Sequence, residues 1–235
     1  PEVGGPYGPY YQSQRLDIYR EEADRLVASG HAYRCYCSSE RLANVRQERA
    51  SRKEPLGYDR HCRDLTEGER RNLDASGATS VVRFKMPFDG VTVVDDMIRG
   101  QVTFENRLID DFVMLKSDGF PTYHLASVVD DHLMDITHVL RAEEWLSSTP
   151  RHLLLYEALG YPSPIFVHLP MILGPDRSKL SKRHGATSLL GYRDEGFLPQ
   201  AMLNFLVLLG WSLDDKTELM SRSDLIENFS LERVG

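Results

Sequence analysis

Cysteine and long apolar runs are scarce in this sequence of 235 residues. Three cysteines are too few for the disulfide framework of a small secreted domain, and they fit a reducing compartment better. No window approaches the roughly 20 apolar residues that span a bilayer. The opening "PEVGGPYGPY" lacks the basic start and the apolar centre of a signal peptide. We therefore expect a cytoplasmic protein with no membrane contact.

An excess of positive charge is also missing, because the formal net charge is -7. This charge argues against a protein that coats nucleic acid non-specifically, but it leaves room for a local basic face. Residues 41–71 hold nine Lys/Arg against six Asp/Glu. Such a stretch is either a solvated helix face or a contact with phosphates.

The first half of the sequence predicts helices followed by a β-sheet. In "SQRLDIYREEADRLVASG", the residues Leu16, Tyr19, Ala23 and Leu26 share one face of a helix, with Ser13 as its expected N-cap. "HAYRCYC" predicts a short strand, and "SSERLANVRQERASRK" predicts a charged helix. "TSVVRFKM", "GVTVVDDM" and "GQVTFEN" are short β-rich runs separated by turn residues, which predicts an antiparallel sheet.

The second half alternates strands and helices. "DDFVMLKSDGFPTYHLASVVDDHL" predicts a strand, a Ser-Asp-Gly turn and a helix. "DITHVL" predicts a buried strand, "STPRHLLLYEALG" a helix, and "IFVHLP" another strand. This alternation is typical of βαβ units on a parallel sheet, so the predicted fold class is α/β.

A basic loop, "GPDRSKLSKRHGATS", follows the last of these strands. In such sheets ligands lie beyond the carboxyl ends of the strands. Lys179, Lys182 and Arg183 would offer cationic groups to a polyphosphate there, and Ser181 would add a hydroxyl donor. The alternative is a solvent-exposed basic turn, since loops are often rich in Lys, Ser and Gly.

The segment "SKLSKR" resembles the KMSKS-type loop of class I aminoacyl-tRNA synthetases. Three further segments are similar, in the same order, to glutamyl-tRNA synthetases: "GGPYGPYYQSQRLDIY", "DGFPTYHLASVVDDHLMDITHVLRAEEWLSSTP" and "GFLPQAMLNFLVLLGW". The resemblance implies activation of glutamate by ATP, with Mg2+, to glutamyl-adenylate and its transfer to the 3′ end of tRNA(Glu). It implies Lys179, Ser181 and Lys182 as catalytic residues, and Ile172 and Arg183 as further ATP-binding residues.

The same resemblance implies three glutamate-binding residues. Tyr123 matches a tyrosine whose hydroxyl contacts the amino acid, and Arg141 resembles an arginine that holds a carboxylate. Ser127, one helical turn after Tyr123, stands where bacterial relatives usually have asparagine, which has a longer reach. Asp130, Asp131 and their neighbours are expected near the tRNA acceptor end and not as a metal cluster.

The cysteines suggest a zinc site. Zinc needs four ligands, whereas the chain has three cysteines. In some relatives the fourth ligand is a tyrosine at the spacing of Tyr58, and the alternative is three free thiols. The candidate ligands are Cys35, Cys37, Tyr58 and Cys62, with His61 and Asp64 as rivals of the tyrosine.

The resemblance also implies a division into domains. The expected parts are 1–17, the end of the first Rossmann half; 18–121, an inserted α+β acceptor-binding domain; 122–185, the second Rossmann half with the basic loop; and 186–235, the start of a helical stem-contact region. The chain begins at Pro1 and has no His-x-Gly-His string, so we expect a monomeric fragment that is inactive by itself. Two alternatives stay open: a glutamyl-queuosine tRNA(Asp) synthetase and a non-catalytic module that binds the tRNA acceptor stem.

Overall fold

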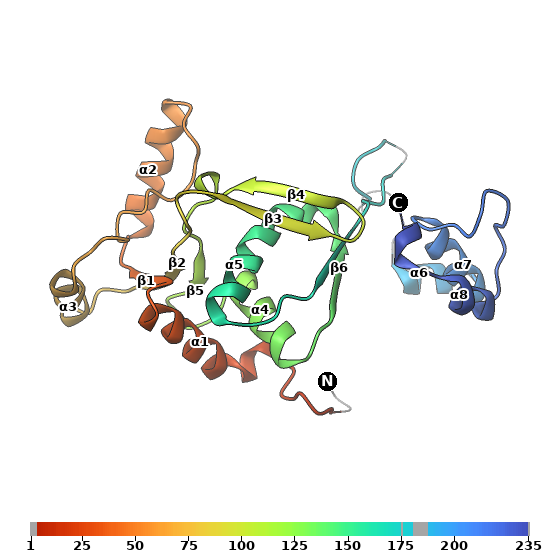
Figure 1. Ribbon diagram of the computed structural model, residues 1–235, viewed down its shortest axis with the longest axis horizontal. Coiled ribbons are helices and arrows are strands. Elements are labelled where there is room, and N and C mark those ends of the chain that lie inside the picture. The colour runs from red at the N-terminus through yellow and green to blue at the C-terminus, as the bar shows by residue number, and fades with distance from the viewer. Residues whose placement is uncertain (1–3, 175, 181–187, 235) are drawn as a thin grey trace. The chain divides into compact units, whose positions relative to one another are not determined.

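The protein's structure, a computed structural model, describes residues 4–174, 176–180 and 188–234 (Figure 1). The chain divides into two compact units, each assembled from separated segments. Unit 1 comprises Pro1–Val94, Thr103–Thr137 and Ser148–Pro164. Unit 2 comprises Asp95–Val102, His138–Ser147 and Ile165–Gly235. The four-part division expected from the resemblance stays a prediction.

Unit 1 combines an antiparallel sheet with helices. Its sheet has the order β1-β2-β5, with β1 (Ala32–Cys35), β2 (Val81–Phe84) and β5 (Val113–Leu115). Its helices are α1 (Leu16–Ala28), α2 (Ser39–Ser51), α3 (Glu67–Ala75), α4 (Tyr123–Leu133) and α5 (Thr149–Leu159), with 3-10 turns η1 (Gln12–Gln14) and η2 (Asn106–Leu108). Helix α1 packs on β1 and α4, and α4 packs on α5.

The apolar stripe predicted for the first helix is confirmed, because Tyr19, Ala23 and Leu26 of α1 are completely buried. The expected N-cap is wrong. Ser13 lies in the 3-10 turn η1, and α1 begins only after Arg15. Since a 3-10 turn often precedes an α-helix, sequence periodicity places such a boundary only to within a turn.

A second sheet has the strand order β4-β3-β7-β6. Its strands are β3 (Val91–Asp96), β4 (Gly100–Glu105), β6 (His138–Ala142) and β7 (Ile165–Leu169). Strands β6 and β7 are parallel over their whole length, and β3 joins β7 in parallel where Asp96 faces Phe166. This pairing confirms the α/β prediction. The boundary between the two units crosses the β3–β4 hairpin.

Two strand predictions are wrong. The three β-rich runs do not share one antiparallel sheet, because β2 lies between β1 and β5 whereas β3 and β4 belong to the second sheet. "DITHVL" is not a buried strand either: β6 is an edge strand, and Leu140 is 50% exposed. An alternating or apolar run identifies a strand but not its neighbours, so both errors concern long-range pairing.

The rest of unit 2 is mostly helical. Its elements are η3 (Glu143–Ser148), whose last residue belongs to unit 1, α6 (Leu189–Asp194), α7 (Pro199–Leu208), α8 (Arg222–Asn228) and η5 (Leu231–Arg233). Trp211 anchors the segment after α7, because its ring is buried and its Nε1 donates to the Ser230 carbonyl at 3.0 Å. None of the helices in the described part of the chain has the length and apolar character that crossing a bilayer requires.

Candidate active site and metal centre

The basic loop leaves β7 through a small antiparallel ladder. The Leu180 N–H donates to the Ile172 carbonyl at 2.9 Å, and Leu173 forms an isolated bridge with Lys179. Inside this ladder, the Gly174 N–H donates to the Ser178 carbonyl at 2.8 Å. The ladder fixes the backbone of Lys179 beyond the carboxyl end of β7, where an α/β sheet places ligands. Ser181, Lys182 and Arg183 lie outside the described residues.

Lys179 is paired with Glu144 of η3. Its Nζ lies 2.7 Å from both carboxylate oxygens of Glu144. The two side chains are 57% and 37% exposed, so water screens their charges and the ion pair is weak.

Ile172 is half-exposed and also lines an apolar pocket of about 230 Å³ within unit 2. The polar groups that would orient a ligand are missing from the lining of this pocket, so it is better explained as a packing seam.

Arg141 projects from β6 onto β7. Its Nε donates to Nε2 of His168 at 3.0 Å, and its Nη2 lies 3.4 Å from the Trp145 carbonyl. The guanidinium carbon is 5.4 Å from the centre of the Phe166 ring, within cation–π range. The hydrogen bond to His168 and the contact with the Phe166 ring together restrict the plane of the Arg141 guanidinium.

Behind Arg141 lies a buried histidine–carboxylate pair. His168 Nδ1 is 2.5 Å from Asp96 Oδ2, and both side chains are 0% exposed. Asp96 Oδ1 also accepts the backbone N–H groups of Ile98 and Arg99 at 3.0 and 2.9 Å. Burial raises the pKa of Asp96, but the hydrogen bonds from Arg99, His168 and Ile98 outweigh it, so the net pKa is lowered. Asp96 is therefore a carboxylate.

Sequence reasoning missed this pair, although a signal was present. In β3 the buried positions alternate as Thr92, Val94 and Asp96, so the period of two places the carboxylate on the inward face. His168 likewise stands in the middle of an apolar strand. A buried polar side chain in such a run requires a hydrogen-bond partner. Asp96 and His168 are each other's partner. Glu144, the partner of Lys179, carried no comparable signal.

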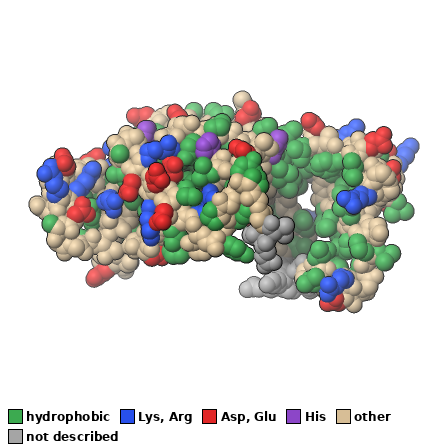
Figure 2. Space-filling model, turned by 90° about the horizontal axis from the view of Figure 1, so that it is seen from below, with side chains coloured by type: hydrophobic (Ala, Val, Ile, Leu, Met, Phe, Trp, Pro, Cys, Tyr) green, Lys and Arg blue, Asp and Glu red, His purple; other side chains and the backbone are tan. Residues whose placement is uncertain are grey.

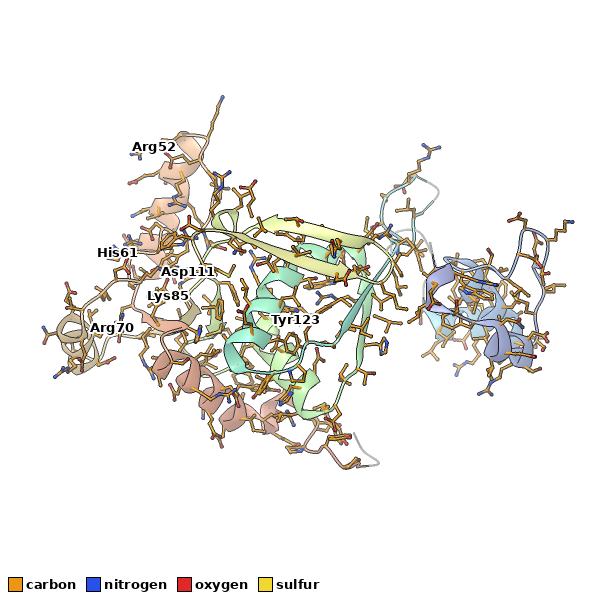
Figure 3. All side chains as sticks on the ribbon, in the orientation of Figure 1. Arg52, His61, Arg70, Lys85, Asp111 and Tyr123 are labelled. Atoms are coloured by element: carbon orange, nitrogen blue, oxygen red, sulfur yellow. The ribbon has the colours of Figure 1, made fainter. Side chains whose placement is uncertain are left out.

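The other glutamate-site candidates lie in unit 1. Tyr123 is the first residue of α4, is 44% exposed, and has its ring centre 5.5 Å from that of His152 (Figure 3). Ser127 lies one turn later, and its Oγ is 3.5 Å from the His124 carbonyl. Tyr123 and Ser127 thus share one helix face, as predicted. Arg141, Ile172 and Lys179 belong to unit 2.

The "VVDDH" segment has structural partners within unit 1. Asp130 accepts from Arg15 Nε at 2.8 Å and from the Tyr19 hydroxyl at 2.7 Å. Asp131 accepts from the hydroxyl of Tyr156 at 3.2 Å, and its neighbour His132 stacks on another ring. The two carboxylates serve different partners, which disfavours a shared metal ion.

The three cysteines of unit 1 meet in one cluster. The Sγ atoms of Cys35, Cys37 and Cys62 lie within 4.8 Å of one another, and those of Cys37 and Cys62 are 3.5 Å apart. The Tyr58 hydroxyl is 3.2 Å from Cys35 Sγ and 3.6 Å from Cys37 Sγ. Among the residues that the structure describes, no His, Asp or Glu joins this cluster, which places His61 and Asp64 outside it.

The cluster has the dimensions of a metal centre. In a tetrahedral zinc site with Zn–S distances of ~2.3 Å, two thiolates lie about 3.8 Å apart, which the Cys37–Cys62 distance approaches. A hydrogen bond from Cys62 lowers the pKa of the Cys35 thiol against the opposing effect of burial, and Tyr58 acts in the same direction. The same hydrogen bond, together with burial, raises the pKa of the Cys62 thiol. Arg41 Nη1 lies 3.5 Å from Cys37 Sγ, so a cation faces the thiols.

The whole chain is similar to proteins of known family. The family model for the catalytic domain of class I tRNA synthetases (E and Q) matches residues 2–235. The chain belongs to this family. It is 64% identical over 235 residues to the glutamate–tRNA ligase of Dehalococcoides mccartyi (strain CBDB1) and 56% identical to that of Moorella thermoacetica. All of the chain is covered in both comparisons, but only 47% and 48% of the relatives, so it spans about half their length.

Solved structures give the same result for this synthetase domain. A crystal structure of glutamate–tRNA synthetase from Elizabethkingia anophelis matches with a TM-score of 0.91 and 40% identity, covering 100% of this chain and 52% of that one. A glutamate–tRNA ligase from Elizabethkingia meningosepticum, described as in complex with its amino acid, matches equally well. The fold is therefore the Rossmann-like α/β fold of class I synthetase catalytic domains, as predicted.

Some of the arginines in the basic stretch 41–71 of this synthetase domain form ion pairs within the fold. Arg41 pairs with Asp59, and Arg63 pairs with the buried Asp111 at 2.8 Å. The exposed cations of α2 and its end are Arg46, Arg52 and Lys53. Figure 3 shows Arg52 at the outer end of α2. Basic and acidic side chains are interspersed on the face of unit 1 that Figure 2 shows, so a phosphate contact there would depend on a few projecting arginines.

Proposed function

We propose that this chain is the part of a glutamate–tRNA ligase that activates glutamate with ATP and transfers it to the 3′ end of tRNA(Glu). The observation that carries the proposal is the match of the whole chain to curated glutamate–tRNA ligases at up to 64% identity. The names of these relatives favour this function over a glutamyl-queuosine tRNA(Asp) synthetase. Their length, about twice that of the chain, favours it over a stand-alone acceptor-stem module.

In the proposed reaction, a carboxylate oxygen of glutamate attacks the α-phosphorus of ATP and pyrophosphate leaves. Lys179, on its ladder beyond β7, stabilises the charge that builds up on the phosphoryl oxygens, together with Ser181, Lys182 and Arg183. The backbone of Ile172 contacts the adenine. Mg2+ enters with the ATP phosphates and offsets their charge. A ribose hydroxyl of the 3′ adenosine of tRNA(Glu) then attacks the acyl carbon of the adenylate, so that the glutamyl ester forms and AMP leaves.

Recognition of glutamate is assigned to Arg141, Tyr123 and Ser127. A guanidinium fork that is held on one side by His168 and Trp145 is suited to paired hydrogen bonds with a carboxylate. The Tyr123 hydroxyl supplies a neutral donor and acceptor. Ser127 has a shorter reach than asparagine, so we expect a bridging water on that side of the amino acid.

We also propose that Cys35, Cys37, Tyr58 and Cys62 hold a zinc ion. Three thiols and a hydroxyl with these separations complete a four-ligand set. Such a closed site contributes folding energy and no chemistry. It would tie the end of β1 to the segment 58–62, and so steady the exposed cations of α2 for contact with tRNA phosphates.

An aminoacylation experiment with the full-length enzyme tests the proposal. Full-length enzyme is incubated with labelled glutamate, ATP and Mg2+ and, in separate reactions, with tRNA(Glu), tRNA(Gln) or queuosine-containing tRNA(Asp) purified from cells. We expect labelled glutamate to be attached to intact tRNA(Glu), and no label to be attached to tRNA(Glu) from which the 3′ adenosine has been removed. Label on tRNA(Asp) that survives this treatment would establish the queuosine enzyme instead, and tRNA retention without any charging would establish a binding module.

A further inference from the structure

The contacts of His168 fix its tautomer. Nε2 of the ring receives the Nε–H of Arg141, and a guanidinium is always a donor and never an acceptor. Nε2 must therefore carry the lone pair, and Nδ1 must carry the proton that it donates to Asp96. Only the neutral Nδ1–H form satisfies both contacts, because a proton on Nε2 would face another N–H.

Burial and two neighbouring cations favour this neutral form of His168, whereas Asp96 opposes it. Arg141 on β6 and Arg99 after β3 are cations near the ring, and Asp96 on β3 is a carboxylate in contact with it. Glu143 is engaged with Arg99 at 2.8 Å. Burial lowers the pKa of His168, the hydrogen bond to Asp96 raises it, Arg141 and Arg99 lower it, and the net change is downward from the ordinary value of 6.5.

We propose that Asp96 and His168 are positioning residues for glutamate recognition: Asp96 holds His168 in the Nδ1–H tautomer, and His168 then aims the guanidinium of Arg141. This inference rests on the proposed function, because it assigns Arg141 the substrate carboxylate. Without the Nε2 acceptor, the Arg141 fork loses the hydrogen bond that fixes its plane. Protonation of His168 has the same effect, since its new Nε2–H repels the Nε–H of Arg141.

Three variants of the full-length enzyme separate positioning from packing. His168→Asn keeps a donor near Nδ1 but has no group at Nε2, whereas His168→Gln places its amide oxygen near Nε2. Asp96→Asn keeps the shape of the carboxylate. The N–H groups of Ile98 and Arg99 both donate to Oδ1, whereas only the backbone N–H of His168 is nearer to Oδ2, so the amide oxygen should stay at the Oδ1 position. The NH2 would then donate to His168 Nδ1 and impose the Nε2–H tautomer.

We expect His168→Asn and Asp96→Asn to raise KM for glutamate roughly ten- to hundredfold, while KM for ATP stays within a factor of about two. His168→Gln should recover part of this loss. In the wild type, KM for glutamate should rise as the pH falls below the lowered pKa of His168, and this acid limb should vanish in His168→Asn. A parallel rise of both KM values, in proportion to lost thermal stability and equal in the Asn and Gln variants, would mean that His168 only packs.

The tautomer is measured independently of activity by 15N NMR of histidine-labelled enzyme, with His168→Asn assigning the signal. The expected result is an unprotonated Nε2 in the wild type and an unprotonated Nδ1 in Asp96→Asn. A protonated Nε2 in the wild type overturns the inference whatever the kinetics. A wild-type enzyme that charges no glutamate overturns the proposed function, and with it the role in glutamate binding, while the NMR result still decides the tautomer.

Discussion

The ammonium of Lys179 lies 2.7 Å from both carboxylate oxygens of Glu144, within unit 2. The first lysine of the basic loop is thus paired with a neighbouring carboxylate. A half-exposed pair of this kind is worth about 0–1 kcal/mol. Glu144 is therefore a weakly bound partner, and under the proposed function the phosphates of ATP would displace it.

Removing the charge of Glu144 should help ATP to bind. In Glu144→Gln the lysine is released from its ion pair, and KM for ATP is expected to fall by up to about fivefold, the equivalent of 1 kcal/mol. The measurement is aminoacylation by the full-length enzyme at varied ATP. Glu157→Gln, on an exposed position of α5, is the matched control and should leave KM unchanged. A higher KM for ATP in Glu144→Gln would show that Glu144 assists the loop.

Lys179→Ala should act on the chemical step. If the ammonium stabilises charge that appears only in the transition state, its removal lowers kcat for ATP–pyrophosphate exchange by about 100- to 1,000-fold and leaves KM for glutamate nearly intact. Exchange is measured with the full-length enzyme in the presence of tRNA(Glu). Lys216→Ala removes an exposed lysine elsewhere in unit 2 and should exchange normally. A defect confined to KM for glutamate would contradict the assignment of Lys179 to the phosphates.

Local pattern and family resemblance predicted the elements well but their pairing poorly. The buried face of α1 was predicted correctly, because apolar residues recur in an amphipathic helix with a period of about 3.6 residues. Its members Tyr19, Ala23 and Leu26 are all buried. The strands were also located from local pattern, as short β-rich runs bounded by turn residues. Their neighbours were not, since the parallel contact of Asp96 with Phe166 joins residues 70 positions apart, and local sequence does not encode it.

The candidate site divides in the same way. Arg141 and Lys179 could be named from the resemblance, whereas their partners His168 and Glu144 follow only from the fold. The Cys35–Cys62 contact could be anticipated because thiols are rare and have few roles. The choice of Tyr58 over His61 needed three-dimensional distances, because the two residues differ by only three positions in sequence.

Metal content tests the cysteine cluster. Full-length enzyme purified without chelator should contain about one zinc per chain by mass spectrometry of the metals, and Cys37→Ser should abolish it. Tyr58→Phe should weaken binding, while His61→Ala and Asp64→Ala, which alter residues outside the cluster, should retain the metal. Freshly purified enzyme with no metal and three freely titrating thiols would instead establish that the cysteines are unliganded.

The largest loss of stability is expected at Asp111, which is completely buried in unit 1 (Figure 3). Its carboxylate accepts from Arg63 Nη1 at 2.8 Å and from the Tyr33 hydroxyl at 2.8 Å. Asp111→Ala leaves the buried Arg63 cation uncompensated, so the free energy of unfolding should fall by about 3–5 kcal/mol. Urea denaturation measures this loss. Asp24→Ala is the matched control, because its pair with Arg34 is exposed and worth at most about 1 kcal/mol. Equal losses in the two variants would mean that the buried ion pair contributes nothing beyond a surface one.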